Sequence, residues 1–262
     1  MTLTQLTDHV WIWPCLAKEA MMQPNVGVVI GQSETVLIDA GNGAPHAQQI
    51  KNALQEMGAP PVRHIIFTHH HWDHVFGAYL FDAQVIANVR SVPFLREKRR
   101  ASWGEPFLQE RWERYPRMRE EVMYQRQAAG NWDELQIVLP DITFEEAASF
   151  VVDGDIQLKM WHVGGMHAFD SIVVQVVQER VMFVGDSFYA PPTYEQEPDQ
   201  EDTIAVEVIH RFLRDDVALY VDGHNKPYSH KQMQLLIRWQ MMKQASMRKS
   251  PTNDETGDYS TI

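Results

Sequence analysis

The sequence has little of what marks secreted, membrane-spanning or disulfide-rich proteins. Cys15 is its single cysteine, so no internal disulfide can form, as expected in a reducing compartment. No run approaches the roughly 18 apolar residues of a membrane-spanning helix. The first residues, MTLTQLTDHVWIWP, show neither the basic region nor the apolar core of a signal peptide. We therefore expect a cytoplasmic protein with no membrane partner.

Basic residues are also scarce. The chain holds 23 Lys and Arg against 35 Asp and Glu, for a formal net charge of −12 at pH 7. This balance disfavours binding to nucleic acid, because a polyanion needs a positive surface. A small-molecule substrate is the expected partner. The sequence does not set the oligomeric state, so a homo-oligomer stays open.

Histidine, by contrast, is concentrated in one place. The stretch FTHHHWDHVFG, residues 67–77, holds four of the 12 histidines. In an extended segment, side chains two residues apart share a face. His69 and His71 can therefore converge on one point, whereas His70 faces away.

The end of the same stretch predicts a second ligand group. If the chain turns into a helix at Trp72, the side chains of Asp73 and His74 project to a neighbouring point. This spacing suits two adjacent metal sites. Imidazole and carboxylate ligands favour zinc, and iron or manganese is also compatible.

The rest of the chain has an α/β pattern of short β-branched runs and amphipathic segments. Residues 92 to about 130 have helical patterning interrupted at Pro106 and Pro116, which predicts a helical insertion. The polar residues 249–262 predict a disordered tail. Strands are expected at 26–31, 35–41, 64–69, 84–89, 149–154, 156–163, 171–177, 180–186 and 217–223, and helices at 45–57, 202–216 and 229–247.

Further metal ligands are expected where later strands give way to turns. His167 follows a strand in WHVGGMHAFDS, Asp186 ends a strand in FVGDSFY, and His224 ends one in YVDGHN. Each is a ligand-type residue preceded by a glycine or close to one. For each residue taken alone there is a simpler alternative. His167 and His224 would be ordinary loop histidines, and Asp186 would be a turn aspartate.

The series His69-x-His71-x-Asp73-His74, His167, Asp186 and His224 resembles the ligand set of the metallo-β-lactamase-fold hydrolases. The likeness covers about residues 8–90 and 140–225. It implies an α/β fold in the form of a four-layer αββα sandwich. It also implies a single domain over 1–248, with the helical insertion at about 92–130.

The resemblance also implies roles for these residues. His69, His71 and His167 would hold one metal ion, Asp73, His74 and His224 a second, and Asp186 would bridge both. The implied activity is that of a dinuclear hydrolase, with two divalent metal ions, zinc being expected. It would use a metal-bridging hydroxide to cleave a small ester, thioester, lactone or amide, and Asp73 would help to shuttle a proton.

Several other residues have expected roles near this site. Tyr189, three residues after Asp186, resembles a tyrosine of the acyl-homoserine lactonase branch that assists the substrate carbonyl; the alternative is a loop tyrosine that fills a gap. Asp39 and Asp170 are candidate partners of the ligand imidazoles. Asp170 stands where the commonest pattern of the family has glycine.

The insertion is the expected source of substrate selectivity. Between Arg96 and Arg126 it holds nine Lys and Arg against six Asp and Glu, a net +3 in an acidic chain. These residues either hold an anionic group of the substrate or form exposed salt pairs along helices.

Three rival functions stay open at this point. A phosphodiesterase or nuclease of the same superfamily is disfavoured by the acidic charge. A di-iron oxygen or nitric-oxide reductase has glutamate where His71 stands and carries a flavin domain. A non-catalytic metal-binding member keeps the fold and the ligands without the activity.

Overall fold

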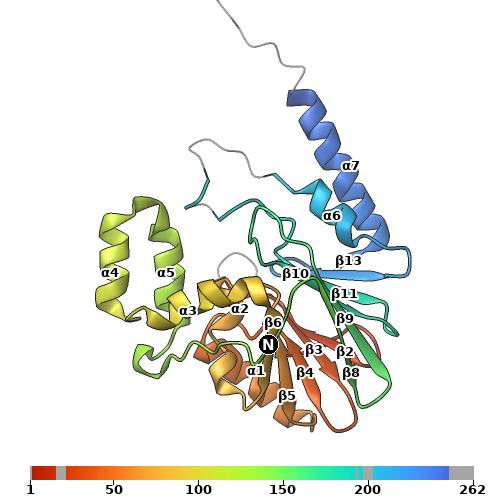
Figure 1. Cartoon of the computed structure of the whole chain (residues 1–262), viewed down its shortest axis with the longest axis horizontal. Helices are drawn as coiled ribbons and strands as arrows, with labels where there is room; N and C mark the ends of the chain where they lie inside the picture. Colours follow the sequence, from red (N-terminus) through yellow and green to blue (C-terminus); the bar gives the residue numbers. More distant parts are fainter. Residues whose placement is uncertain (1, 16–21, 193, 197–202, 248–262) are drawn as a thin grey trace, which may run out of the picture.

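Two β-sheets packed face to face form the centre of the molecule, with helices against their outer faces (Figure 1). The computed structural model describes residues 2–15, 22–192, 194–196 and 203–247. The predicted tail, 249–262, lies outside the described residues. None of the helices within those ranges is both long and apolar enough to span a membrane.

The first sheet joins an antiparallel half to a parallel half. Its strands lie side by side in chain order: β1 (Thr4–Gln5), β2 (Val10–Trp13), β3 (Val26–Ile30), β4 (Thr35–Ile38), β5 (Val62–Ile66), β6 (Gln84–Asn88) and β7 (Ile142–Phe144). Pairs from β1 to β4 are antiparallel, and pairs from β4 to β7 are parallel. The carboxyl ends of β4 and β5 therefore share one edge, which leads into Asp39 and into the histidine cluster.

The second sheet holds the later strands, also in chain order. They are β8 (Ala147–Val152), β9 (Ile156–His162), β10 (Ile172–Val176), β11 (Val181–Gly185), β12 (Leu219–Asp222) and β13 (Tyr228–Ser229). The pair β11–β12 is parallel, whereas the other pairs are antiparallel. Both strands of the parallel pair therefore end at the same edge, directly before Asp186 and close to His224.

The helices fall into three groups along the chain. Early helices are α1 (Ala44–Glu56) and α2 (Trp72–Val75), the insertion holds α3 (Val92–Arg100), α4 (Glu105–Arg114) and α5 (Arg119–Ala128), and late helices are α6 (Val206–Phe212) and α7 (His230–Met247). Short 3₁₀ turns lie at Ala78–Leu80, Val89–Ser91, Pro116–Met118 and Trp132–Glu134.

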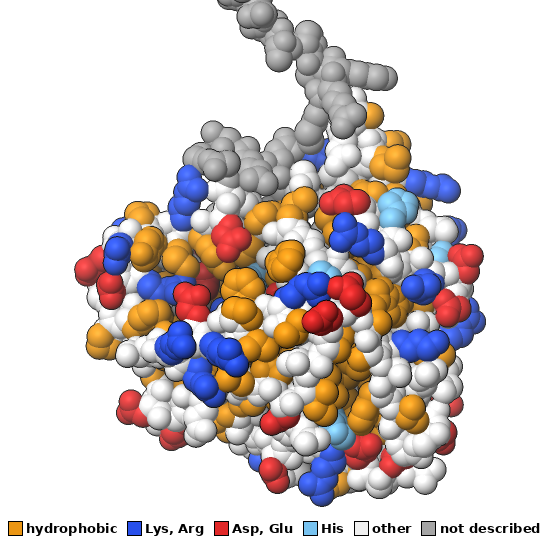
Figure 2. All heavy atoms as spheres, in the orientation of Figure 1, with side chains coloured by type: hydrophobic (Ala, Val, Ile, Leu, Met, Phe, Trp, Pro, Cys, Tyr) orange, Lys and Arg blue, Asp and Glu red, His pale blue; other side chains and the backbone are white. Residues whose placement is uncertain are grey.

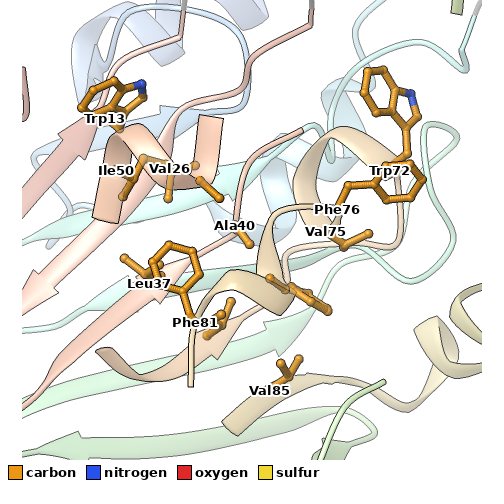
Figure 3. Packing of buried hydrophobic residues seen from close by; sticks show 14 of the residues in the cluster. Trp13, Val26, Leu37, Ala40, Ile50, Trp72, Val75, Phe76, Phe81 and Val85 are labelled. Carbon is orange, nitrogen blue, oxygen red and sulfur yellow. The ribbon is translucent and has the colours of Figure 1, made fainter. Parts of the chain in front are cut away.

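Successive side chains along the strands point to opposite faces of the sheet and so enter separate hydrophobic cores. On β3 and β4, Val28 and Leu37 point outward and belong to one cluster with Ile50 of α1. Leu37 and Ile50 are labelled in the close view of this cluster (Figure 3). Their chain neighbours Val29 and Val36 point the other way, into the core between the two sheets. Successive strand residues face opposite sides of a sheet, so an almost continuous apolar strand can serve two layers at once.

A third core lies outside the second sheet. Met182 and Val184 of β11 pack there with Phe212 of α6 and Met233 of α7. The order of layers is therefore helix, sheet, sheet, helix, which confirms the predicted αββα sandwich.

The insertion is helical, as predicted, but Pro106 begins a helix instead of breaking one. It lies in the first turn of α4, where a missing N–H costs nothing. The same helix ends at Arg114, before Pro116. Buried Leu108 and Val122 lie on the two antiparallel neighbours α4 and α5, which form a lobe at one side of the molecule (Figure 1).

Helix α6 is shorter than the predicted helix 202–216. Its end is fixed by a side chain of the neighbouring strand. The Tyr220 hydroxyl donates to the Arg214 carbonyl oxygen at 2.9 Å and accepts from the Arg214 N–H at 3.0 Å. Because these bonds pair both backbone groups of Arg214, this residue does not need the hydrogen bonds of a continuing helix.

Candidate metal centre

The histidine cluster leaves the first sheet as the sequence predicts. After β5 the chain bends at Thr68 and His69 and is extended at His71, whose backbone has φ −63° and ψ 148°. Helix α2 begins at Trp72 and places Asp73 and His74 in its first turn. The bends before His71 and the start of helix α2 after it therefore direct the two halves of the cluster to neighbouring points.

Three imidazoles meet at the first point. Nδ1 of His71 lies 3.1 Å from Nε2 of His69 and 3.0 Å from Nε2 of His167. Burial, followed by the neighbouring imidazoles, lowers the pKa of His69 and of His71 well below the ordinary value. Both rings are therefore neutral at pH 7, the form that binds a cation.

Two carboxylates and two imidazoles meet at the second point. Oδ2 of Asp73 lies 3.4 Å from Nε2 of His74 and 3.2 Å from Nε2 of His224. Asp186 approaches both imidazoles from the end of β11. The ligand-type atoms within each of the two groups all lie within 4.8 Å of one another.

Asp186 connects the two groups. Its Oδ2 lies 3.4 Å from Nε2 of His167, 3.3 Å from that of His74 and 3.2 Å from that of His224. Gly185 precedes it with φ +50°, a conformation that favours glycine, and a Cβ there would press on Thr68. The turn at the end of β11 thus needs glycine to deliver the carboxylate between the groups.

The charges of the second group depend on one another. Burial alone would lower the pKa of His224, but the carboxylates of Asp186 and Asp73 outweigh it and raise that pKa to about 10. The pKa of His74 is likewise raised well above its ordinary value, against burial, by Asp73, Asp39 and Asp186. The site therefore attracts positive charge strongly.

The donor set fits divalent cations. Nε2 of His74, Nε2 of His224 and Oδ1 of Asp186 are buried without a hydrogen-bond partner among the described residues. Buried polar atoms are normally paired, so unpaired ones point to a bound group. Donors around a tetrahedral zinc ion, with bonds of about 2.0–2.1 Å, lie about 3.4 Å apart. The contacts between these side chains measure 3.2–3.4 Å.

Hydrogen bonds from the far nitrogens of two ligand-type imidazoles hold these rings in place. His74 donates from Nδ1 to Oδ2 of Asp39 at 2.7 Å, and His167 donates from Nδ1 to the Ala190 carbonyl oxygen at 2.8 Å. Asp39 is itself held by Thr68, whose N–H and hydroxyl donate to it at 2.7 and 2.8 Å. These bonds fix the tautomers, so that Nε2 of His74 and of His167 faces the site.

Close packing at the end of β12 leaves no space beside Asp186. A Cβ at Gly223 would collide with Oδ1 of Asp186 and would lie 3.0 Å from Cε1 of His74. The glycine before His224 is therefore a steric requirement of the centre.

His70 takes no part in either group, as its parity predicts. It donates from Nδ1 to Oδ1 of Asp170 at 2.7 Å and stacks on Phe94 of α3 at a centroid distance of 4.0 Å. Asp170 was a candidate partner of a ligand imidazole and instead pairs with this non-ligand histidine. The buried pair ties the loop after β9 to the loop after β5.

Tyr189 lies beside the site within a hydrogen-bond network. Its ring centroid is 5.9 Å from that of His167, and its hydroxyl accepts from Nδ2 of Asn225 at 2.8 Å. Buried Asp222 accepts from the N–H and Nδ2 of Asn225 at 2.9 Å each. Burial, then Asp222 and Asp186, raises the pKa of Tyr189 well above its ordinary value, so the phenol stays protonated.

The centre opens into a cavity of about 760 Å³. His71, Asp73, His167 and Asp186 lie at its base. Its walls include side chains that the sequence did not single out: Trp72, Glu120, Glu121, Tyr124, Phe188, Tyr194, Leu236 and Trp239. Distant parts of the chain supply them, so only the fold brings them together.

The comparisons with known proteins agree with this geometry. A family model described as the metallo-beta-lactamase superfamily matches residues 21–244. The chain belongs to the metallo-beta-lactamase superfamily. The superfamily consists mostly of metal-dependent hydrolases. No curated protein matches the chain.

Several solved structures share the fold of this chain at low sequence identity. A metallo-beta-lactamase from Pontibacter korlensis is 17% identical with a TM-score of 0.61, covering 90% of this chain and 98% of its own. A family protein from Thermus thermophilus is 19% identical with a TM-score of 0.66, covering 93% and 82%. A stereoselective inverting sec-alkylsulfatase from Pseudomonas sp. is 15% identical with a TM-score of 0.67, covering 96% of this chain but 44% of its own.

Proposed function

We propose that the chain is a dinuclear metal-dependent hydrolase, with zinc as the expected metal, that cleaves a small ester, thioester, lactone or amide. One observation carries this proposal above the others. Oδ2 of Asp186 lies within 3.2–3.4 Å of imidazole nitrogens from both ligand groups. A single carboxylate so placed can serve two cations.

We assign each ligand group to one cation. His69, His71 and His167 would hold the first cation, Asp73, His74 and His224 would hold the second, and Asp186 would bind both. Divalent cations held there would supply Lewis-acid polarisation of the substrate and activation of water. The burial of these ligands keeps bulk water from weakening the electrostatic interactions.

Two further side chains would act on the substrate. Asp73 lies at the base of the cavity and has a carboxylate to hold a proton during the transfer to the leaving group. Tyr189 stays a neutral hydroxyl that accepts from Asn225 and hydrogen-bonds to Asp222, and it would donate to a substrate oxygen by exchanging its bond to Asp222 for one to the substrate.

The proposal is tested on protein purified without added metal. Elemental analysis should find two equivalents of a divalent metal, and p-nitrophenyl acetate should be hydrolysed faster than bis-p-nitrophenyl phosphate. D186N should lose metal and hydrolysis together. D215N is the matched control, because Asp215 is fully exposed and lies outside both ligand groups.

Other outcomes would point to a rival function. Faster cleavage of the phosphodiester would favour a phosphodiesterase. Two bound metals without hydrolysis of either compound would favour a non-catalytic member. One metal that D186N does not disturb would rule out Asp186 as the bridge.

A further inference from the structure

We propose that the cavity selects uncharged or cationic substrates that carry a bulky aromatic group, and that Glu121 sets the preference for positive charge. This inference rests on the proposed function, since it describes the substrate of the same site. It is carried by the composition of the cavity wall, by the positions of the basic side chains around it, and by an unpaired buried oxygen.

The wall is wide and rich in aromatic side chains. A cavity of about 760 Å³ is far larger than an acetyl ester needs and lies in the range that holds drug-sized molecules. Tyr124 of α5, Tyr194 after β11, Tyr228 of β13 and Trp239 of α7 line it together with Phe188. Rings from four parts of the fold thus face one space, which favours a flat apolar group in the substrate.

The charged side chains of the wall are all acidic. Among the described lining residues there is no lysine or arginine, whereas Asp73, Asp186, Glu120 and Glu121 all line the cavity. Asp73 and Asp186 are assigned as ligands of the proposed cations. Glu120 and Glu121 are left on the wall, where they would repel an anionic substituent.

The basic side chains of the insertion do not line the cavity among the described residues, although Arg111 and Lys98 lie close enough to act on Glu121. Arg126 pairs with Glu105 at 2.6 Å, and Arg114 pairs with Glu110 at 3.4 Å. On the face shown in Figure 2, acidic and basic side chains are interspersed over this lobe. These pairs and the absence of a basic side chain from the described cavity lining favour the alternative of exposed salt pairs over the holding of an anionic group.

One of the two carboxylate oxygens of Glu121 has no hydrogen-bond partner among the described residues. Its Oε1 accepts from Nε2 of Gln125 at 2.7 Å and lies 3.7 Å from Nη2 of Arg111. Its Oε2 is buried and has no hydrogen-bond partner among the described residues. A buried carboxylate oxygen without a donor is unfavourable, so the Glu121 side chain, which lines the cavity, would turn this oxygen toward an ammonium or N–H group of a bound substrate.

A charge series of esters tests the inference at pH 8, where Glu121 is ionised. The substrates are p-nitrophenyl esters of phenylacetic acid with a methyl, aminomethyl or carboxylate group in the para position, and p-nitrophenyl acetate is the small reference. We expect kcat/KM to exceed that of the carboxylate ester by about tenfold or more for the other two aryl esters. Equal values, or a preference for the carboxylate or for acetate, would overturn the inference.

Variants locate the source of the charge preference. E121Q keeps the shape of the side chain and should reduce the ratio of aminomethyl to carboxylate kcat/KM about tenfold. E110Q is the matched control, because Glu110 is an exposed helical glutamate outside the cavity, and it should leave the ratio unchanged. The wild-type series needs no variant, so the inference stays testable if E121Q does not fold.

A binding measurement separates this inference from the proposed function. Biphenyl-4-methanol and 4-phenylbenzylamine are not substrates, and they differ mainly in charge. On the metal-loaded protein the amine should bind more tightly by calorimetry, and E121Q but not E110Q should remove the difference. If no ester is hydrolysed but this order holds, the hydrolase proposal fails and the selectivity stands. If the alcohol binds as tightly as the amine, the selectivity is wrong.

Discussion

Oδ2 of Asp39 lies 2.7 Å from Nδ1 of His74, at the boundary between the end of β4 and helix α2. The aspartate is 2% exposed and has a left-handed backbone with φ +64°. A residue that is no ligand thus orients a proposed ligand from a strained turn, and both the charge and the conformation can be tested.

Replacing Asp39 should weaken the second metal site selectively. D39N keeps the left-handed backbone, which asparagine tolerates, but removes the charge behind His74. We expect about 10- to 100-fold weaker binding of one of two metal equivalents, measured by competition with a chelator. D153N is the control, because Asp153 is the other aspartate with positive φ among the described residues and lies at the surface beside Ser33. Equal loss of both equivalents would contradict a selective role.

Adding one methyl group at Gly223 should disable the centre. In G223A the new Cβ would displace Oδ1 of Asp186, so metal content and hydrolysis should fall together. G58A is the control: Gly58 has φ +70° and open space around a Cβ, so it should cost about 1–2 kcal/mol of stability and leave metal content intact. A G223A protein with two metals would show that the carboxylate has room to move.

Neighbouring histidines should respond differently to alanine. H71A should lose metal, because Nδ1 of His71 faces both other imidazoles of the first group. H70A should keep both equivalents but unfold at lower urea concentration, since it leaves Asp170 unpaired at a cost of about 1–3 kcal/mol. Elemental analysis and urea titration of both variants check this contrast. Loss of metal from H70A would assign it to the centre after all.

Removing the Tyr189 hydroxyl should slow catalysis without changing metal content. For Y189F we expect kcat to fall about 100-fold if the hydroxyl donates to the substrate oxygen in the transition state. Y220F is the control, because the Tyr220 hydroxyl bonds only outside the cavity, to Arg214 among others. An unchanged kcat for Y189F would leave Tyr189 with a structural role, as the partner of Asn225.

The pH dependence of stability should carry a contribution from Glu121. Burial raises the pKa of this carboxyl from 4.5 to about 7, although Arg111 and Lys98 oppose the rise. Between these values the folded chain holds a proton that the unfolded chain has lost. Its contribution to the free energy of unfolding is therefore present at pH 4.5 and is lost as the pH rises to about 7.

Urea titrations at pH 5.5 and pH 8 measure this contribution against E121Q. Relative to that variant, the wild type should lose free energy of unfolding between the two pH values. The same comparison with E110Q should give a constant difference. A wild type that gains stability over E121Q toward pH 8 would show that the pKa of Glu121 is lowered instead.

The ligand-type residues were readable in the sequence because each follows a strand. Two-residue alternation predicted that His69 and His71 converge, which they do although the chain bends at Thr68 and His69, and buried β-branched runs located the turns that carry Asp186 and His224. Strand β2 was not predicted, because its VWIW has too few residues for a clear period and its burial depends on neighbours across the sheet.

The cavity wall could not be predicted, because it depends on how separate elements dock. The sequence gives the net charge of the insertion. It does not give the side to which each side chain of α5 points, because that depends on how the helix is rotated against the rest of the fold. The role of Asp222 had one indication in the sequence. It is an aspartate at the end of a buried strand in YVDGHN, which indicates a carboxylate that is hydrogen-bonded inside the protein. No pattern in the sequence joins Tyr124 to Tyr194 or Trp239.

The lobe of α4 and α5 lies outside the two sheets, yet α5 supplies part of the cavity wall. On the proposals made above, the metal ligands and part of the substrate-selecting wall lie in different stretches of the chain. Mutations between Glu105 and Ala128 can accumulate without touching a single proposed ligand. If the proposed function holds, natural or laboratory evolution could change the substrate through the α5 part of the wall while the ligands, and with them the reaction, are conserved.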